Sequence, residues 1–245
     1  MASTERMSRR DLFRVAAVSS IATACGIVGP RRPRVAAAAT PSTPQEALQA
    51  LRDGNNRYAT TIGSTNHMTS FDEDLAEIRA HTEGSQQPYA ALLSCADSRV
   101  APELIFDESL NRLFVCRVAG NIVTPEIIAS LEYAVVALGT VKAVMVLGHG
   151  NCGAVSAANS LTRVANTQIS ALYALLRAGV TLGGSGVDNQ SRANARVQAA
   201  LLTTSSPAIS DALKTGQVAV VPAYYDVASG RVTELPPIVG VTATP

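Results

Sequence analysis

The stretch "TPEIIASLEYAVVALGTVKAVMVLGHGNCG", residues 124–153, decides the fold of this chain. Thr124 is a typical N-cap, Pro125 a typical first helical residue and Gly139 a typical terminator, so a helix is predicted between them. The apolar run over 141–149 then predicts a strand that is buried on both faces. A helix that leads into such a strand is typical of a parallel sheet with helices packed on it.

The same alternation continues on both sides of this stretch. Short apolar runs predict two earlier strands at 89–95 and 112–120. Residues 217–235 predict a fourth strand, a turn at Ser229-Gly230 and an edge strand. Further helices are predicted at 43–61, 71–82, 166–179, 188–204 and 206–214, with the glycine-rich segment 179–186 separating two of them. The predicted fold class is therefore α/β, a central and mainly parallel β-sheet flanked by α-helices, with an edge strand at the C-terminus.

Composition narrows the class of partner. The chain has 245 residues, 47% of them hydrophobic, which is enough to bury the core of one domain. Its formal net charge of +1 argues against nucleic acid or an anionic membrane surface as partner. Aromatic residues make up only 4% and Trp is absent, so stacking platforms for bases or sugars are not expected. With Cys25 set aside, three cysteines remain, an odd number that favours metal binding, catalysis or burial over disulfides.

The first 39 residues have the order of regions that is expected of an export signal. The segment "SRRDLFRVAAVSSIATACGIVG", residues 8–29, begins with the twin arginines Arg9 and Arg10. The apolar run behind them is shorter than the roughly 20 residues of a membrane span, and small residues after it offer cleavage sites. We therefore predict a twin-arginine signal peptide over 1–39 and an exported domain over 40–245, with the export machinery as a partner.

Two other interpretations of the N-terminus are kept. The segment can be a basic tail with a chance arginine pair. Cys25 follows a weak lipoprotein box, "IATAC", so a lipid anchor at this cysteine is a minority alternative. The predicted location is outside the cytoplasmic membrane, in the extracellular space, the periplasm or the cell envelope.

Two of the predicted strands end in residues that bind metals. Cys95 lies in "SCADSR", residues 94–99, and His149 and Cys152 lie in "GHGNCG", residues 148–153. The carboxyl ends of neighbouring parallel strands meet at one edge of a sheet, and the 54 residues from Cys95 to His149 (149 − 95) allow a helical crossover. Two cysteines and one histidine form an accepted ligand set for catalytic zinc, with the fourth position open.

Asp97 and Arg99 follow the first cysteine closely and have two possible arrangements. Asp97 can occupy the fourth zinc position and close the site. Paired with Arg99, it can instead accept a hydrogen bond from zinc-bound hydroxide and orient it. Gly148, Gly150 and Gly153 are expected to let the backbone turn around the ion.

Other interpretations of the same residues explain less. A disulfide between Cys95 and Cys152 leaves His149 without a role, and a Cys–His nucleophilic pair needs no second cysteine. A structural zinc site needs a fourth protein ligand, and none is well placed. Three further residues are expected to lie outside the site: Cys116 as a small buried hydrophobe, and His67 and His81 as solvent-facing side chains.

Taken together, these motifs resemble the β-class carbonic anhydrases. That family has the pattern C-x-D-x-R, here "CADSR" at 95–99, followed by H-x-x-C, here "HGNC" at 149–152. The likeness extends through segments 100–123, 130–135, 194–198 and 218–232. The resemblance implies one Zn²⁺ per subunit, held by Cys95, His149 and Cys152, with Asp97 and Arg99 as the catalytic pair.

The resemblance also implies residues that bind the substrate. Gln86 matches the glutamine that donates a hydrogen bond to bicarbonate or CO₂ across a dimer interface, which implies a homodimer or a dimer-based higher oligomer. Phe114 and Tyr133 match positions that line the apolar pocket, although both can equally be ordinary core residues. Gly153 places a backbone group beside the zinc. Ala154 departs from the family's second glycine, and the absence of Trp predicts that the second bicarbonate site of regulated members is missing.

The predicted function is reversible hydration of CO₂ to bicarbonate and a proton by zinc-bound hydroxide. Two alternatives use the same zinc site. One is hydrolysis of carbonyl sulfide or carbon disulfide, which are linear like CO₂. The other is a non-catalytic zinc-binding protein of the envelope, which would not need the pair of Asp97 and Arg99.

Overall fold

The computed structural model describes residues 40–61 and 75–238, and both segments belong to one compact unit. The predicted signal peptide over 1–39, with Cys25, lies outside the described residues, as does His67. None of the helices that are described is long and apolar enough to cross a membrane.

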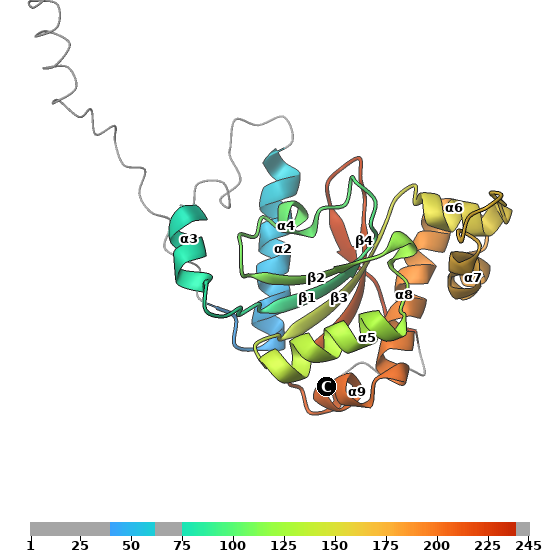
Figure 1. The fold of residues 1–245 in the computed structure, drawn as a ribbon. Helices are drawn as coiled ribbons and strands as arrows, with labels where there is room; N and C mark the ends of the chain where they lie inside the picture. Colours follow the sequence, from blue (N-terminus) through green and yellow to red (C-terminus); the bar gives the residue numbers. More distant parts are fainter. Residues whose placement is uncertain (1–39, 62–74, 239–245) are drawn as a thin grey trace, which may run out of the picture. The chain divides into compact units, whose positions relative to one another are not determined.

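The central element is a five-stranded sheet in the order β2-β1-β3-β4-β5 (Figure 1). The strands are β1 (Ala90–Ser94), β2 (Leu113–Arg117), β3 (Ala143–His149), β4 (Ala219–Tyr225) and β5 (Val232–Glu234). The first four are parallel, and β5 pairs with β4 in the antiparallel direction. This confirms the predicted fold class, including the edge strand at the C-terminus.

Helices cover both faces of the sheet. They are α2 (Pro44–Thr61), α3 (Leu75–Thr82), α4 (Pro102–Ile105), α5 (Pro125–Glu132), α6 (Gly153–Ser160), α7 (Ala171–Gly183), α8 (Val187–Ser205) and α9 (Pro207–Lys214), with a 3-10 turn η2 (Ala119–Asn121). Met145 of β3 and its neighbours on one face pack against α2 and α4. Val144 and Val146 point to the other face, where α5, α8 and α9 lie (Figure 1). The central strands are therefore buried on both faces, as their apolar runs predict.

The helix predicted between Thr124 and Gly139 is present with the expected ends. The Thr124 hydroxyl accepts a hydrogen bond from the amide of Ile127 at 3.4 Å, and Gly139 ends the helix with a φ of 68°. Its second half, η3 (Tyr133–Leu138), is a π-helix, which the sequence pattern did not indicate. The helix still returns the chain to the amino end of β3, as a crossover between parallel strands requires.

The prediction for residues 166–186 was partly wrong. Helix α7 begins at Ala171 and continues through Gly179 to Gly183, so these glycines are not part of a linker. A Cβ atom on Gly179 would lie 2.5 Å from Cα of Asn194, and one on Gly183 would lie 2.4 Å from Cα of Gln190. Both glycines are thus contact points at which α7 lies directly against the backbone of α8.

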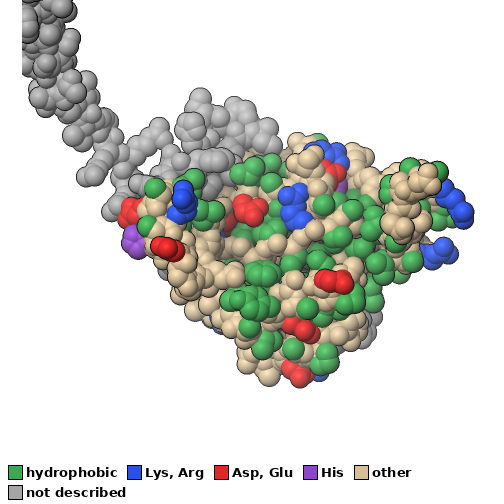
Figure 2. Space-filling view, in the orientation of Figure 1, with side chains coloured by type: hydrophobic (Ala, Val, Ile, Leu, Met, Phe, Trp, Pro, Cys, Tyr) green, Lys and Arg blue, Asp and Glu red, His purple; other side chains and the backbone are tan. Residues whose placement is uncertain are grey.

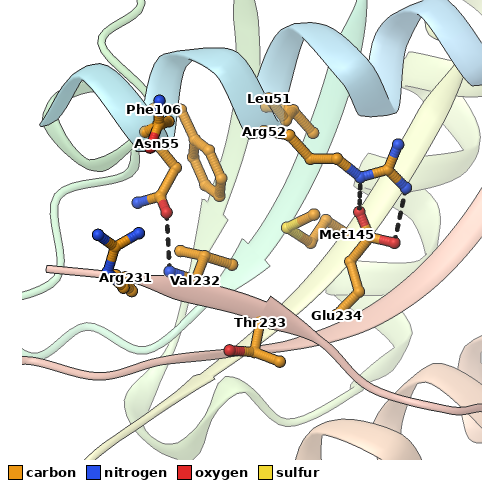
Figure 3. A pocket seen from close by; sticks show the side chains of 10 residues that line it. Leu51, Arg52, Asn55, Phe106, Met145, Arg231, Val232, Thr233 and Glu234 are labelled. Carbon is orange, nitrogen blue, oxygen red and sulfur yellow. Dashed lines mark hydrogen bonds and ion pairs between the residues drawn. The ribbon is translucent and has the colours of Figure 1, made fainter. Parts of the chain in front are cut away.

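Side chains of α2 hold the edge strand β5 in place. The buried Asn55 accepts a hydrogen bond from the amide of Val232 at 2.8 Å and donates one to the carbonyl of Gly230 at 2.9 Å. Arg52 forms two hydrogen bonds with Glu234, at 2.7 and 2.8 Å (Figure 3). A cavity of about 360 Å³ lies between these elements. Through these contacts, β5 and α2 cover the outer edge of β4. Strand β4 contributes part of the surroundings of the metal-binding residues.

Candidate metal centre

Three potential ligands come together at the carboxyl edge of the sheet. Cys95 directly follows β1, His149 is the last residue of β3, and Cys152 is the N-cap of α6. Their ligand atoms all lie within 4.8 Å of one another, and no other such group occurs among residues 40–61 and 75–238. All three are buried, with exposures of 4%, 0% and 1%.

The imidazole of His149 has a ring nitrogen that is available to bind a cation. Its Nδ1 lies 3.0 Å from the carbonyl oxygen of Gly150, and a carbonyl can only accept, so Nδ1 carries the proton. Nε2 then holds a lone pair, and it is buried without a hydrogen-bond partner. Leaving such an atom unpaired costs free energy unless something binds it. The donor set therefore fits a metal ion.

The two thiols support the same conclusion. A hydrogen bond from Cys152 lowers the pKa of Cys95, and the same contact raises the pKa of Cys152. The amide of Gly120 also donates to Sγ of Cys95 at 3.3 Å. Two neighbouring thiols, one of which has a lowered pKa, and an imidazole with an unpartnered Nε2 are ligands suited to zinc.

Asp97 is held by Arg99 rather than placed among the ligands. The guanidinium donates from Nε to Oδ1 at 2.9 Å and from a terminal nitrogen to Oδ2 at 2.7 Å, and the amide of Arg99 donates to Oδ1 at 2.9 Å. These bonds lower the pKa of Asp97 well below its usual range. Oδ2 lies 3.9 Å from Nε2 of His149, so the ionised carboxylate borders the place where a metal would bind.

The glycines of "GHGNCG" serve a different purpose from the one predicted. None of Gly148, Gly150 and Gly153 has a positive φ; the left-handed residue of this turn is Asn151, with a φ of 50°. A Cβ on Gly148 would lie 2.8 Å from the carbonyl oxygen of Ser191, and one on Gly150 would lie 3.0 Å from the hydroxyl of Tyr224. A Cβ on Gly153 would contact nothing within 4 Å. The first two glycines therefore allow close packing on α8 and β4.

Comparisons with known proteins agree with this geometry. The family model for carbonic anhydrase matches residues 90–232. Carbonic anhydrase 2 of Mycobacterium tuberculosis is 34% identical over 197 residues, which cover 78% of this chain and 92% of that protein. The carbonic anhydrase of Mycolicibacterium smegmatis is 35% identical over 198 residues, which cover 78% and 93%.

Comparison with solved structures shows the class of carbonic anhydrase. The β-carbonic anhydrase CcaA superposes with a TM-score of 0.60 at 25% identity, covering 80% of this chain and 94% of that one. The Coccomyxa β-carbonic anhydrase in complex with acetazolamide gives 0.56 at 27% identity, covering 77% and 86%. This chain belongs to the β-class carbonic anhydrases.

Of the predicted substrate residues of this carbonic anhydrase, Gln86 lies away from the metal ligands of its own chain. Gln86 is exposed and precedes β1, whereas Cys95 follows it, and five strand residues span about 16 Å. The rings of Phe114 and Tyr133 lie 6.3 Å apart between centroids, and Tyr133 is 49% exposed. Gly153, by contrast, directly follows Cys152 at the start of α6.

Several residues around the ligands were missed from the sequence. Arg117 of β2 donates to the carbonyl of Cys95 at 3.2 Å and to that of Asp97 at 2.7 Å. Asn194 of α8 donates to the carbonyl of Gly120 at 2.8 Å, and Gln198 donates to Asn194 at 3.1 Å. Both α8 side chains are fully buried. Gln190, Asn194 and Gln198 recur every four residues on the buried face of α8, and this spacing was the available signal.

Of the three residues expected to lie outside the centre, the two that the structure describes behave as predicted. Cys116 is 8% exposed and belongs to the hydrophobic core, and burial raises the pKa of its thiol. His81 is exposed. The three described cysteines are free, so the alternative of a disulfide between Cys95 and Cys152 does not hold in this structure.

Proposed function

We propose that this β-class carbonic anhydrase holds zinc through Cys95, His149 and Cys152 and catalyses the reversible hydration of CO₂ to bicarbonate and a proton. The single observation that carries the proposal is the buried, unpartnered Nε2 of His149, whose ring offers a ligand atom within 4.8 Å of the sulfurs of Cys95 and Cys152. When bound there, zinc supplies a Lewis acid that lowers the pKa of a water molecule to near neutrality.

Asp97 and Arg99 orient the reactants in this proposal. Since the pair with Arg99 keeps Asp97 ionised, its carboxylate can only accept hydrogen bonds at neutral pH. An acceptor at 3.9 Å from Nε2 of His149 selects ligands that present a proton to it, such as water or the hydroxyl of bicarbonate. A water molecule or hydroxide held there would donate a hydrogen bond to Asp97, which would leave its lone pair free to face the carbon of CO₂.

The main test compares zinc content and CO₂ hydration by stopped flow. Cys152→Ser is expected to lose both, because it removes one ligand from a buried set. Cys116→Ala is the matched control, since this cysteine is buried in the core outside the centre. Full activity in zinc-free protein or in Cys152→Ser would refute the zinc mechanism.

The substrate residues act, in our proposal, on the centre of a second copy. Gln86 lies away from the metal ligands of its own chain, and both Gln86 and Tyr133 are exposed. Figure 2 shows hydrophobic side chains gathered on the face that carries β2 and α5, and such a patch fits a contact between protomers. The β-carbonic anhydrases of Sordaria macrospora, which share the fold, are tetrameric.

Hybrid dimers test this arrangement. Gln86→Ala removes the side chain that a partner would receive, and Cys152→Ser removes the metal site. If each chain serves the other's centre, coexpressed variants restore one complete site in the hybrid although each parent is impaired. A hybrid no more active than the mixture of parents would show that Gln86 acts within its own chain.

Hydrolysis of carbonyl sulfide or carbon disulfide remains the alternative activity, because these gases have the same linear shape. Turnover of all three gases by the zinc-loaded protein decides between them. Hydration of CO₂ at a rate above the other two supports the proposal. A protein that binds zinc but turns over none of them would be the non-catalytic alternative.

We further propose that residues 1–39 export the folded, zinc-loaded domain by the twin-arginine route. The order of basic, apolar and small-residue regions supports this. Zinc bound in a reducing cytoplasm would also protect Cys95 and Cys152 from oxidation after export. Replacing Arg9 and Arg10 by Lys should leave active enzyme in the cytoplasm, and continued export would contradict the proposal. Mass spectrometry of the exported protein tests for lipid on Cys25.

A further inference from the structure

Asn151 lies between the two ligands of the second motif, His149 and Cys152. Its backbone amide and its backbone carbonyl both form hydrogen bonds with charged side chains. Its φ of 50° lies in the left-handed region, which residues other than glycine adopt at a cost in free energy. Its amide donates to Oδ1 of Asp188 at 2.9 Å, and its carbonyl accepts from Arg99 at 3.1 Å. Two charged side chains from distant segments therefore fix the residue that joins His149 to Cys152.

We infer that Asp188 is a positioning residue for the catalytic pair: by holding the Asn151 amide it places the Asn151 carbonyl as the third acceptor of Arg99. The inference rests on the proposed function and assigns a role to a residue that touches neither substrate nor metal. The other two acceptors of Arg99 are the carboxylate oxygens of Asp97. One guanidinium thus connects the metal-binding turn to the carboxylate that orients the reactants.

The position of Asp188 is itself determined by neighbours. It lies in the first turn of α8, and its carboxylate faces the hydroxyl of Tyr224, where burial and then this carboxylate raise the pKa of the phenol to about 12. The guanidinium of Arg192, one turn further along α8, lies 3.5 Å from the centroid of the Tyr224 ring and holds that ring. Gly150 allows this arrangement, since a Cβ there would lie 3.0 Å from the Tyr224 hydroxyl and 3.8 Å from Oδ1 of Asp188.

The exposure of Asp188 makes the inference testable, because its removal leaves no cavity in the core. A carboxylate in the first turn also favours the helix by its charge alone. The two roles differ in what they require. Positioning needs an acceptor at Oδ1, whereas the helix effect needs the negative charge.

Asp188→Ala and Asp188→Asn separate these roles. Asn keeps the acceptor and loses the charge, and Ala loses both. For Asp188→Ala we expect kcat for CO₂ hydration to fall and zinc release to a chromophoric chelator to accelerate, each roughly 10-fold, with KM little changed. Asp188→Asn should restore most of both values. Asn189→Ala, an exposed neighbour whose amide bonds only the Ser185 carbonyl, serves as the control.

The outcomes are distinct. Wild-type zinc release and kcat in Asp188→Ala would overturn the inference, and so would an Asp188→Asn variant as impaired as Asp188→Ala. Should the wild-type protein fail to hydrate CO₂, the proposed function fails, but the zinc-release comparison still decides whether Asp188 positions the metal-binding turn.

Discussion

Replacing Gly179 by Ala tests whether close contact between α7 and α8 supports the metal centre. The added Cβ would lie 2.5 Å from Cα and 2.6 Å from Cβ of Asn194. Carbon atoms in ordinary contact are about 3.5 Å apart, so one helix must move by about 1 Å. Overpacking of this kind costs about 1–3 kcal/mol. Ala is favoured over Gly in a helix by about 1 kcal/mol, which leaves a net destabilisation of up to about 2 kcal/mol.

The displacement also reaches the metal ligand. Asn194 donates to the carbonyl of Gly120, and the amide of Gly120 donates to Sγ of Cys95. A shift of Asn194 by about 1 Å lengthens the first of these bonds beyond hydrogen-bond distance. We therefore expect weaker zinc binding in addition to lower stability.

Urea denaturation and zinc titration measure the two effects of Gly179→Ala. Gly84→Ala is the matched control, because its Cβ would meet nothing within 4 Å and its φ is not positive. The control should stay within about 0.5 kcal/mol of the wild type. A Gly179→Ala variant as stable as Gly84→Ala, with unchanged zinc affinity, would refute the reasoning, because the helices would have no need of close contact.

Three further predictions concern other parts of the chain. Removal of zinc by a chelator should lower the melting temperature measured by calorimetry, since zinc binds the folded state, and readdition should restore it; no shift would mean that the site is not occupied. Asn55→Ala should destabilise the protein by roughly 2–4 kcal/mol in urea denaturation, since it leaves the partly buried amide of Val232 and the buried carbonyl of Gly230 unpaired; a change below about 1 kcal/mol would contradict this. Burial raises the pKa of Glu108, so the stability it contributes is present below its unfolded pKa of about 4.3 and is lost as the pH rises through the folded pKa. Glu108→Gln should therefore gain stability relative to the wild type as the pH rises above about 4, and a pH-independent difference would argue against it.

The sequence by itself determined the parts of this protein that depend on local pattern. Apolar runs identify β1 to β4, and the reason is clearest for β1 and β3, because strands buried on both faces have few polar side chains to interrupt the run. Thr124, Pro125 and Gly139 mark the ends of one helix, because capping depends on residues within one turn. Parallel strands bring their carboxyl ends to one edge, so the meeting of Cys95 with His149 and Cys152 also follows from the chain order.

Only the tertiary structure decided which residues support that centre. The glycine-rich composition around Gly179 predicts a linker, whereas in the fold Gly179 is a contact point between two helices. Its role depends on Asn194, which approaches it from another helix. The turn "GHGNCG" shows the same difference, since Gly150 is required by Tyr224 and Asn151 is held by Asp188. These partners lie in distant segments, and the hydrophobic periodicity of the sequence relates only residues that are close in the chain. A close contact between two backbones is visible in the sequence only as a small side chain. The local sequence motifs identify the metal ligands, whereas packing between distant segments holds these ligands in place.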